Sequence, residues 1–242
     1  MSGARRISSV HPDDLGLFPG APVVRETPRF NYGHAIDGVG ADHKALGPAP
    51  FRSLLERDLR SLLGANPDID HYAIESHELR YFTPDGRGGF VPRTYVPDVT
   101  VRYRSGEIVV LDAKALFFTT LPQWTSREPF ITEAYALDHG VNFVVLSEDE
   151  IRAQPRLGNA QIMERHRYIV RDEAAVLRVR DVLDGLPSPT TIAAVVTAAD
   201  LPGRPGECRA YTALMNLALA GEVALDLGQP LSERTEIRGY AR

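Results

Sequence analysis

The sequence predicts an α/β fold in which a mixed sheet is flanked by helices and followed by a small C-terminal domain. Three observations predict it: an amphipathic helical stretch precedes several strand-like segments, a clear β-hairpin occupies residues 99–111, and a Pro-rich break at 186–189 precedes a helix-helix-ribbon pattern. The chain has 242 residues, 43% of them hydrophobic, which is enough to bury a substantial core.

Three segments of different composition indicate three parts. Residues 1–47 are rich in Gly, Pro, Asp and His without a sustained hydrophobic period, so we expect an extended N-terminal arm. Residues 48–185 carry the α/β pattern and form the main domain. Residues 186–242, after the Pro-rich break, form the C-terminal domain.

The main domain begins with a helix and two strands. Residues 51–63 have apolar side chains at helical spacing, and Gly64 is a plausible stop. Residues 71–82 and 90–96 alternate as strands do, with a Gly-rich turn at 84–89 between them.

The hairpin follows directly. Residues 99–103 alternate, Ser105-Gly106 makes a short turn, and 108–111 form a buried strand. Residues 127–139 resemble a crossover helix that leads into another buried strand at 142–146. This order of elements predicts a mixed sheet with helices on its faces.

Helices and a β-ribbon make up the rest of the chain. We expect helices at 159–167, 172–184, 190–199 and 207–220, and strands at 222–227 and 234–238. Two helices followed by a ribbon are typical of a winged helix-turn-helix. This segment carries about as many acidic as basic residues, so a protein partner is favoured over DNA for it.

Composition narrows the class of protein. The lone Cys208 excludes an intramolecular disulfide and a thiol cluster for zinc. No stretch approaches the ~18–20 apolar residues of a membrane span, and Arg5 and Arg6 are not followed by the apolar region of a signal peptide. We therefore expect a cytoplasmic protein. The net charge of −5 counts mildly against a broad nucleic-acid surface.

The main chemical signal is Asp98 with the Asp112-Ala113-Lys114 stretch. Asp112 and Lys114 are two apart on one strand, so their side chains leave the same face, roughly 6–7 Å apart along the chain. Asp98 opens the partner strand, and pairing brings its carboxylate beside Asp112. Two carboxylates at the end of a sheet suit Mg²⁺, which would polarise a scissile phosphate, while Lys114 orients water or stabilises charge on the phosphate oxygens.

Each of these residues also has a purely structural interpretation. Asp98 could cap a strand while Asp112 and Lys114 form an edge ion pair. Their position after a buried apolar strand favours chemistry, because charges held there need a partner or a metal. Glu56 lies near the apolar stripe of the first helix and could add a third carboxylate. Alternatively, it is an exposed residue paired with Arg52 or Arg60.

Other candidates are weaker. The seven histidines show no metal-ligand spacing, so a His-based zinc site is not expected, and His77 is interpreted as a packed or surface residue. Gln123 and Trp124 follow the Lys114 strand and could contact DNA, although a core position is the more frequent outcome for a tryptophan.

These motifs together resemble a known family. The segments 53–58, 95–98 and 109–114 resemble the TnsA-like endonuclease subunit of heteromeric bacterial transposases, within the PD-(D/E)xK restriction-enzyme-like nucleases. The likeness continues through 143–151 and 155–159 and covers about residues 50–170.

The resemblance implies a restriction-endonuclease-like fold and a Mg²⁺-dependent endonuclease (Mn²⁺ can substitute). It implies cutting at the 5′ strand ends of a transposon, beside a DDE transposase and an AAA+ ATPase regulator. Glu56, Asp98 and Lys114 fall on the family's catalytic residues, and Asp112 stands where some members carry Gln. Glu56, Asp98 and Asp112 are then the expected metal ligands.

Two other functions remain open from the sequence. One is a free-standing restriction, phage or defence nuclease with the same core. The other is an inert DNA-binding or assembly module, against which the intact Asp98, Asp112 and Lys114 argue. Transposase and ATPase genes beside this one would favour the transposon function.

Overall fold

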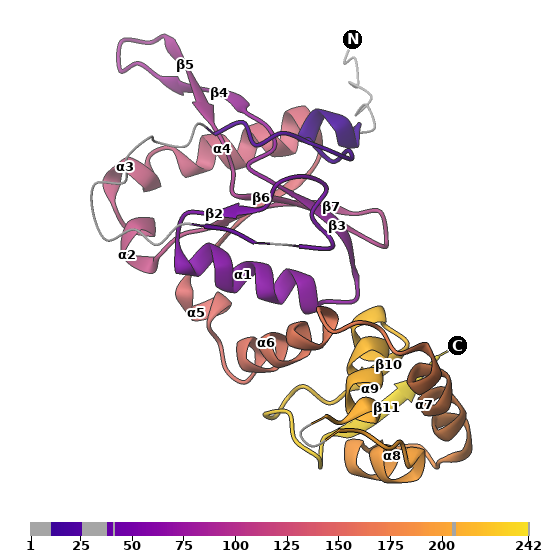
Figure 1. Ribbon diagram of the computed structural model, residues 1–242. Helices are drawn as coiled ribbons and strands as arrows, with labels where there is room; N and C mark the ends of the chain where they lie inside the picture. The colour runs from indigo at the N-terminus through magenta and orange to yellow at the C-terminus, as the bar shows by residue number, and fades with distance from the viewer. Residues whose placement is uncertain (1–10, 26–37, 41, 205–206, 242) are drawn as a thin grey trace, which may run out of the picture. The chain divides into compact units, whose positions relative to one another are not determined.

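The computed structural model describes residues 11–25, 38–40, 42–204 and 207–241. They form two compact units (Figure 1). The first comprises residues up to 59 together with 69–151, and the second comprises 60–68 together with residues from 152 onward.

A four-stranded mixed sheet is the centre of the first unit. Its strands are β3 (Ile69–Ile74), β6 (Val99–Tyr103), β7 (Ile108–Ala113) and β8 (Asn142–Leu146), in the order β3-β6-β7-β8. The first three pair antiparallel, and β8 lies parallel to β7. The predicted hairpin and the mixed sheet are therefore confirmed.

Helices flank this sheet, as the sequence predicts. They are α1 (Leu54–Ala65), α2 (Leu116–Thr119), α3 (Pro122–Thr125), α4 (Glu128–Ala134) and α5 (Glu148–Ile151), and a π-helical turn (Tyr135–His139) extends α4. Figure 1 shows α1 and α4 on opposite faces of the sheet. Ile131 and Tyr135 pack onto Val110 and Phe143 and form one apolar core of the unit.

A separate hairpin projects beyond the sheet (Figure 1). It consists of β4 (Leu79–Pro84) and β5 (Phe90–Tyr95). The single strand expected at 71–82 is thus divided into β3 and β4. The division follows Glu75, whose φ of 44° lies in the left-handed region that non-glycine residues seldom adopt.

The described parts of the N-terminal segment belong to the first unit and contribute buried side chains to it. A 3-10 turn (Pro12–Leu15) leads into a run whose Leu15, Leu17 and Ala21 are buried. Ser76 Oγ donates a hydrogen bond to the Leu15 carbonyl. Short strands β1 (Gly38–Val39) and β2 (Pro50–Phe51) pair antiparallel. Residues 1–10, 26–37 and 41 of the expected arm lie outside the described residues.

The second unit is a helical bundle with a small sheet. Its helices are α6 (Arg156–Arg167), α7 (Glu173–Gly185), α8 (Ile192–Ala199) and α9 (Arg209–Ala220). Its strands are β9 (Thr190–Thr191), β10 (Val223–Leu225) and β11 (Glu236–Tyr240), antiparallel in the order β10-β11-β9. Side chains of Asp172 and Thr191 cap α7 and α8.

The two units divide the chain at 151/152, whereas the Pro-rich break led us to expect the boundary at 186. The physical reason lies in α7, whose Val176 and Val179 are fully buried in the same apolar core as Leu214 and Met215 of α9. Among the described residues, every helix is too short or too polar to cross a membrane.

Candidate functional site

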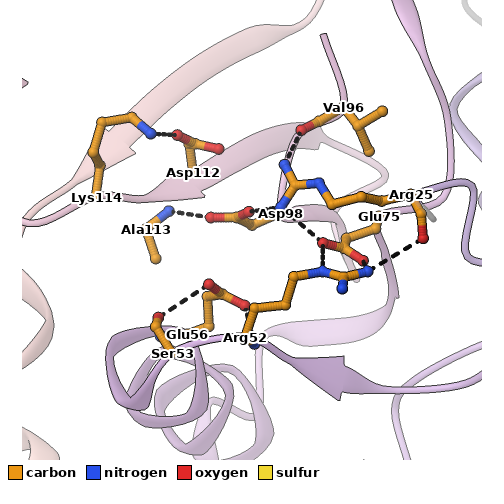
Figure 2. A network of polar contacts seen from close by, with 10 residues as sticks. All are labelled: Arg25, Arg52, Ser53, Glu56, Glu75, Val96, Asp98, Asp112, Ala113 and Lys114. Carbon is orange, nitrogen blue, oxygen red and sulfur yellow. Dashed lines mark hydrogen bonds and ion pairs between the residues drawn. The ribbon is translucent and has the colours of Figure 1, made fainter. Parts of the chain in front are cut away.

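Asp98 and Asp112 meet at one end of the central sheet, in the first unit. The β6–β7 register pairs Val99 with Leu111, which brings Asp98 beside the end of β7. There the Ala113 amide donates a 2.8 Å hydrogen bond to Asp98 Oδ2. Asp112 is almost entirely buried, with 1% of its surface exposed. Figure 2 shows Asp98 between Asp112 and Glu56.

This position is electrostatically unfavourable for an ionised Asp98. Burial raises the pKa of its carboxyl well above the usual value, and the negative charges of Asp112 and Glu56 raise it further. The Ala113 hydrogen bond and the Arg25 guanidinium, 3.6 Å from Asp98 Oδ1, act in the opposite direction. Like charges held together in this way favour a cation between them.

Lys114 follows β7 and turns back to its neighbour. Its Nζ lies 2.9 Å from Asp112 Oδ2, and it lies 4.3 Å from the centre of the Trp124 ring. The edge ion pair considered as the structural interpretation is therefore present. The contact between Lys114 and Asp112 counts as an ion pair and not as a hydrogen bond. Asp112 Oδ2 is buried and accepts no hydrogen bond among the described residues. A carboxylate has several lone pairs, so the ion pair with Lys114 occupies only part of its capacity to accept a cation.

Glu56 is tied to the start of α1. Its carboxylate accepts hydrogen bonds from the Arg52 amide at 2.7 Å and from Ser53 Oγ at 3.0 Å, while Ser53 Oγ accepts one from the Glu56 amide at 3.2 Å. This pattern is close to a capping box. Burial raises the pKa of Glu56. The Arg52 guanidinium, which the alternative interpretation paired with Glu56, instead binds Glu75.

An arginine-glutamate network borders the carboxylates. Glu75 is buried, and Arg52 binds it through Nε and Nη2, both at 2.7 Å. Arg25 adds a 2.8 Å contact to Glu75 and donates to the Val96 carbonyl at 2.9 Å (Figure 2). The left-handed backbone at Glu75 places its side chain in this network, and such backbone outliers gather at functional sites.

Sequence reasoning missed these three residues. Glu75 directly follows the buried end of β3, which is the same signal that identified Asp112. Arg52 gave a weaker signal, since helical spacing assigned it to Glu56. Arg25 had none, because it lies in a segment without periodicity.

Three aromatic side chains, Trp124, Tyr95 and Tyr135, lie near Asp112 and Lys114. Trp124 is 2% exposed, which favours the core position over DNA contact, whereas Gln123 is exposed. Burial raises the pKa of the Tyr95 phenol far above its usual range, and the negative charge of Asp112 raises it further. The same two causes raise the pKa of Tyr135. Both phenols therefore stay protonated at neutral pH.

His77 is buried beside Tyr135. Its Nε2 lies 2.9 Å from the Tyr135 hydroxyl. Burial lowers the pKa of His77 to about 4, and His139 contributes to the shift. His77 is therefore a neutral packed residue at physiological pH.

The donor set suits a hard divalent cation. Mg²⁺ commonly binds one or two carboxylates and completes its shell with waters and phosphate oxygens. The Asp112 carboxylate, whose Oδ2 is paired with Lys114, and the adjacent Asp98 carboxylate could supply these two ligands. Among the described residues, no three His, Cys, Asp or Glu side chains form a group placed to hold a metal, and Glu56 as a third ligand stays a prediction.

Comparison with known proteins adds no assignment. No protein-family model matches the chain, and no curated protein matches its sequence.

Proposed function

We propose that this protein is a metal-dependent DNA endonuclease of the PD-(D/E)xK type. One observation carries the proposal: Asp98 and Asp112 are held together, buried, at the end of the β6–β7 hairpin, with Lys114 beside Asp112. A buried pair of like charges lowers the stability of a fold, and such pairs gather at functional sites.

The residues then have distinct roles. Asp98 and Asp112 would hold Mg²⁺, which supplies a positive charge to polarise the scissile phosphate. A protonated amine cannot ligate a metal, so Lys114 acts on the attacking water or on charge developing at the phosphate oxygens. Glu56 adds negative charge to the site from α1, and Arg52 and Arg25 hold Glu75 next to Asp98.

The biological setting we propose rests on the resemblance to TnsA-like subunits. The chain would cut the 5′ strand ends of a transposon together with a DDE transposase. The order of the helices α8 and α9 and the antiparallel β10-β11-β9 sheet supports the proposal of a winged-helix-like domain. We propose that this second unit binds the AAA+ ATPase partner, since the segment has no excess of positive charge.

Metal binding and cleavage test the assignment together. Titration calorimetry should detect Mn²⁺ binding to the wild-type protein and lose it in Asp98→Ala and Asp112→Ala. Nicking of supercoiled plasmid with Mn²⁺ should fall by at least about 10³-fold in both variants, since each removes part of the metal site.

Asp138→Ala is the matched control. Asp138 is an exposed carboxylate in the turn after α4, and its loss should change neither measurement. An Asp98→Ala protein that binds Mn²⁺ and nicks DNA like the wild type would show that the site is assigned wrongly. A wild-type protein that neither binds Mn²⁺ nor nicks DNA would support the inert-module alternative.

A further inference from the structure

A groove in the first unit, outside the carboxylate site, is lined by three arginines. It lies between the β4–β5 hairpin and the α3–α4 segment and has a volume of about 1050 Å³. Arg80 and Arg93 line it from the hairpin, and Arg127 lines it from the residues that join α3 to α4. Glu78 is the single acidic lining residue, so the groove carries an excess of positive charge.

The three groove arginines lack carboxylate partners in the described part of the chain, unlike the arginines beside the candidate site. Within the described residues, no ion pair neutralises any of them. Arg25 and Arg52, in contrast, both bind Glu75, and arginines of the second unit pair with surface carboxylates. Unneutralised guanidinium groups that line one groove repel each other, and an anion there relieves the repulsion.

Trp124 is the contact shared by the groove and the candidate site, because Arg127 of the groove and Lys114 of the site both lie over its ring. The Arg127 Cζ lies 5.0 Å from the centre of the Trp124 ring, and Lys114 Nζ lies 4.3 Å from the same centre. Two buried nitrogen donors here have no hydrogen-bond partner in the described residues: Arg127 Nε and Trp124 Nε1. Polar groups left unpaired side by side are typical of a surface that is completed by a ligand.

We infer that this groove binds the sugar–phosphate backbone of the DNA duplex that is cut at the carboxylate site, an inference that rests on the proposed function. Arginine forks match phosphate oxygens, and such contacts fix the register of a duplex without reading its sequence. Phe82, which lines the groove and is 59% exposed, offers an apolar surface to the sugars. The cations from Arg93 through Arg127 to Lys114 lead the strand to the metal ligands.

Equilibrium binding of a fluorescein-labelled 30-base-pair duplex, followed by anisotropy in EDTA, tests the groove without cleavage. The full chain and an Arg80→Ala/Arg93→Ala variant are compared over a range of salt concentrations. Both arginines are exposed, so the variant should keep its fold, which its melting temperature checks. We expect binding about 10- to 100-fold weaker and a log–log salt slope smaller by about 2, because two phosphate contacts are lost.

Arg102→Ala/Arg104→Ala is the matched control. It removes the same charge at the far end of β6, whose first residue follows Asp98. We expect its binding and salt slope to stay close to the wild type. Equal weakening in both double variants would reduce the effect to net charge and overturn the groove assignment. Wild-type affinity in the hairpin variant, or no duplex binding by the wild type, would overturn it as well.

Cleavage with Mn²⁺ in the same samples separates the two proposals. A wild-type protein that binds duplex with the expected dependence on the hairpin arginines but does not cut leaves the groove assigned and removes the proposed activity. A wild-type protein that cuts, while the hairpin variant binds normally, leaves the activity and removes the groove.

Discussion

The two units of this protein bury different kinds of side chain. In the first unit the buried set includes Glu75, Asp98, Asp112 and His77, and the charges of Asp98 and Asp112 repel. In the second unit the buried set is mainly Val, Leu, Ala, Met and Ile, and its buried polar side chains are Arg60, Asn159 and Thr235, with no buried carboxylate among the described residues. Arg180 and Glu222 of this unit pair nearer the surface.

The difference indicates that the first unit carries the chemistry and that the second unit contributes mainly to stability. Burying a carboxylate costs free energy unless a partner or a bound ion compensates for it. In the first unit the buried carboxylates Asp98 and Asp112 lie together at one end of the sheet, so this cost is concentrated there. The second unit has no comparable cluster in its described part and is stabilised by ordinary packing. Changes in the first unit should therefore alter chemistry, and changes in the second should alter stability.

Of the three changes that test this comparison, Lys114→Ala should give the largest effect. We expect cleavage to fall by about 10²–10³-fold, equivalent to about 3–4 kcal/mol, because one preorganised stabilising charge is lost. Mn²⁺ affinity should be equal or slightly higher, since a positive charge next to Asp112 is removed. Single-turnover cleavage beside calorimetric titration measures both. Lys114→Arg should not restore the rate, since a planar fork replaces a compact charge.

A Lys114→Ala protein that cuts normally, or that no longer binds Mn²⁺, would contradict the role assigned to this residue and weaken the contrast between the units.

Leu214→Ala tests the other side of the comparison. Leu214 of α9 is fully buried, so its truncation should lower the free energy of unfolding by about 2–5 kcal/mol through lost burial and the cavity left behind. Chemical denaturation measures this. Mn²⁺ binding below the unfolding transition should be unchanged. Leu177→Ala is the matched control, because Leu177 on α7 is 62% exposed and its loss should cost little.

Loss of Mn²⁺ binding in folded Leu214→Ala would mean that the second unit's core supports the metal site, and the proposed difference between the units would not hold.

Asp98→Asn should have the smallest effect on stability, and the sign of this effect distinguishes a metal ligand from a structural residue. The folded pKa of Asp98 is raised, so the folded wild type keeps a proton that the unfolded chain has already released. The contribution of Asp98 to the free energy of unfolding therefore falls as the pH rises from the pKa of Asp98 in the unfolded chain through its pKa in the folded protein. In EDTA at pH 8, Asp98→Asn should be more stable than the wild type by on the order of 1 kcal/mol, the scale of single-residue changes.

Thermal melts of both proteins from pH 8 down to pH 4 measure this difference, which should shrink as the pH falls. Mn²⁺ should stabilise only the wild type, because a ligand that binds the folded state alone raises its stability. If Asp98→Asn is destabilised at pH 8 by as much as Leu214→Ala, Asp98 is a structural residue.

Local pattern predicted most of the secondary structure. Helical spacing located α1, α8 and α9, and alternation located the β6–β7 hairpin, because periods of 3.6 and 2 follow from backbone geometry. The hairpin also placed Asp98 beside Asp112, since strands joined by a short turn have little freedom in register. The π-helical turn after α4 and the short strand β9 left no such pattern.

Only the tertiary structure decided the surroundings of those residues. Arg25 contacts Glu75 although the two residues lie far apart in the sequence, and no local period links them. The same holds for the assignment of α7 to the second core and for Trp124 between Lys114 and Arg127. The sequence by itself determined which residues could carry chemistry, because residue type and local spacing are written in it. Burial, charge pairing and pKa depend on long-range packing, which a single sequence does not reveal.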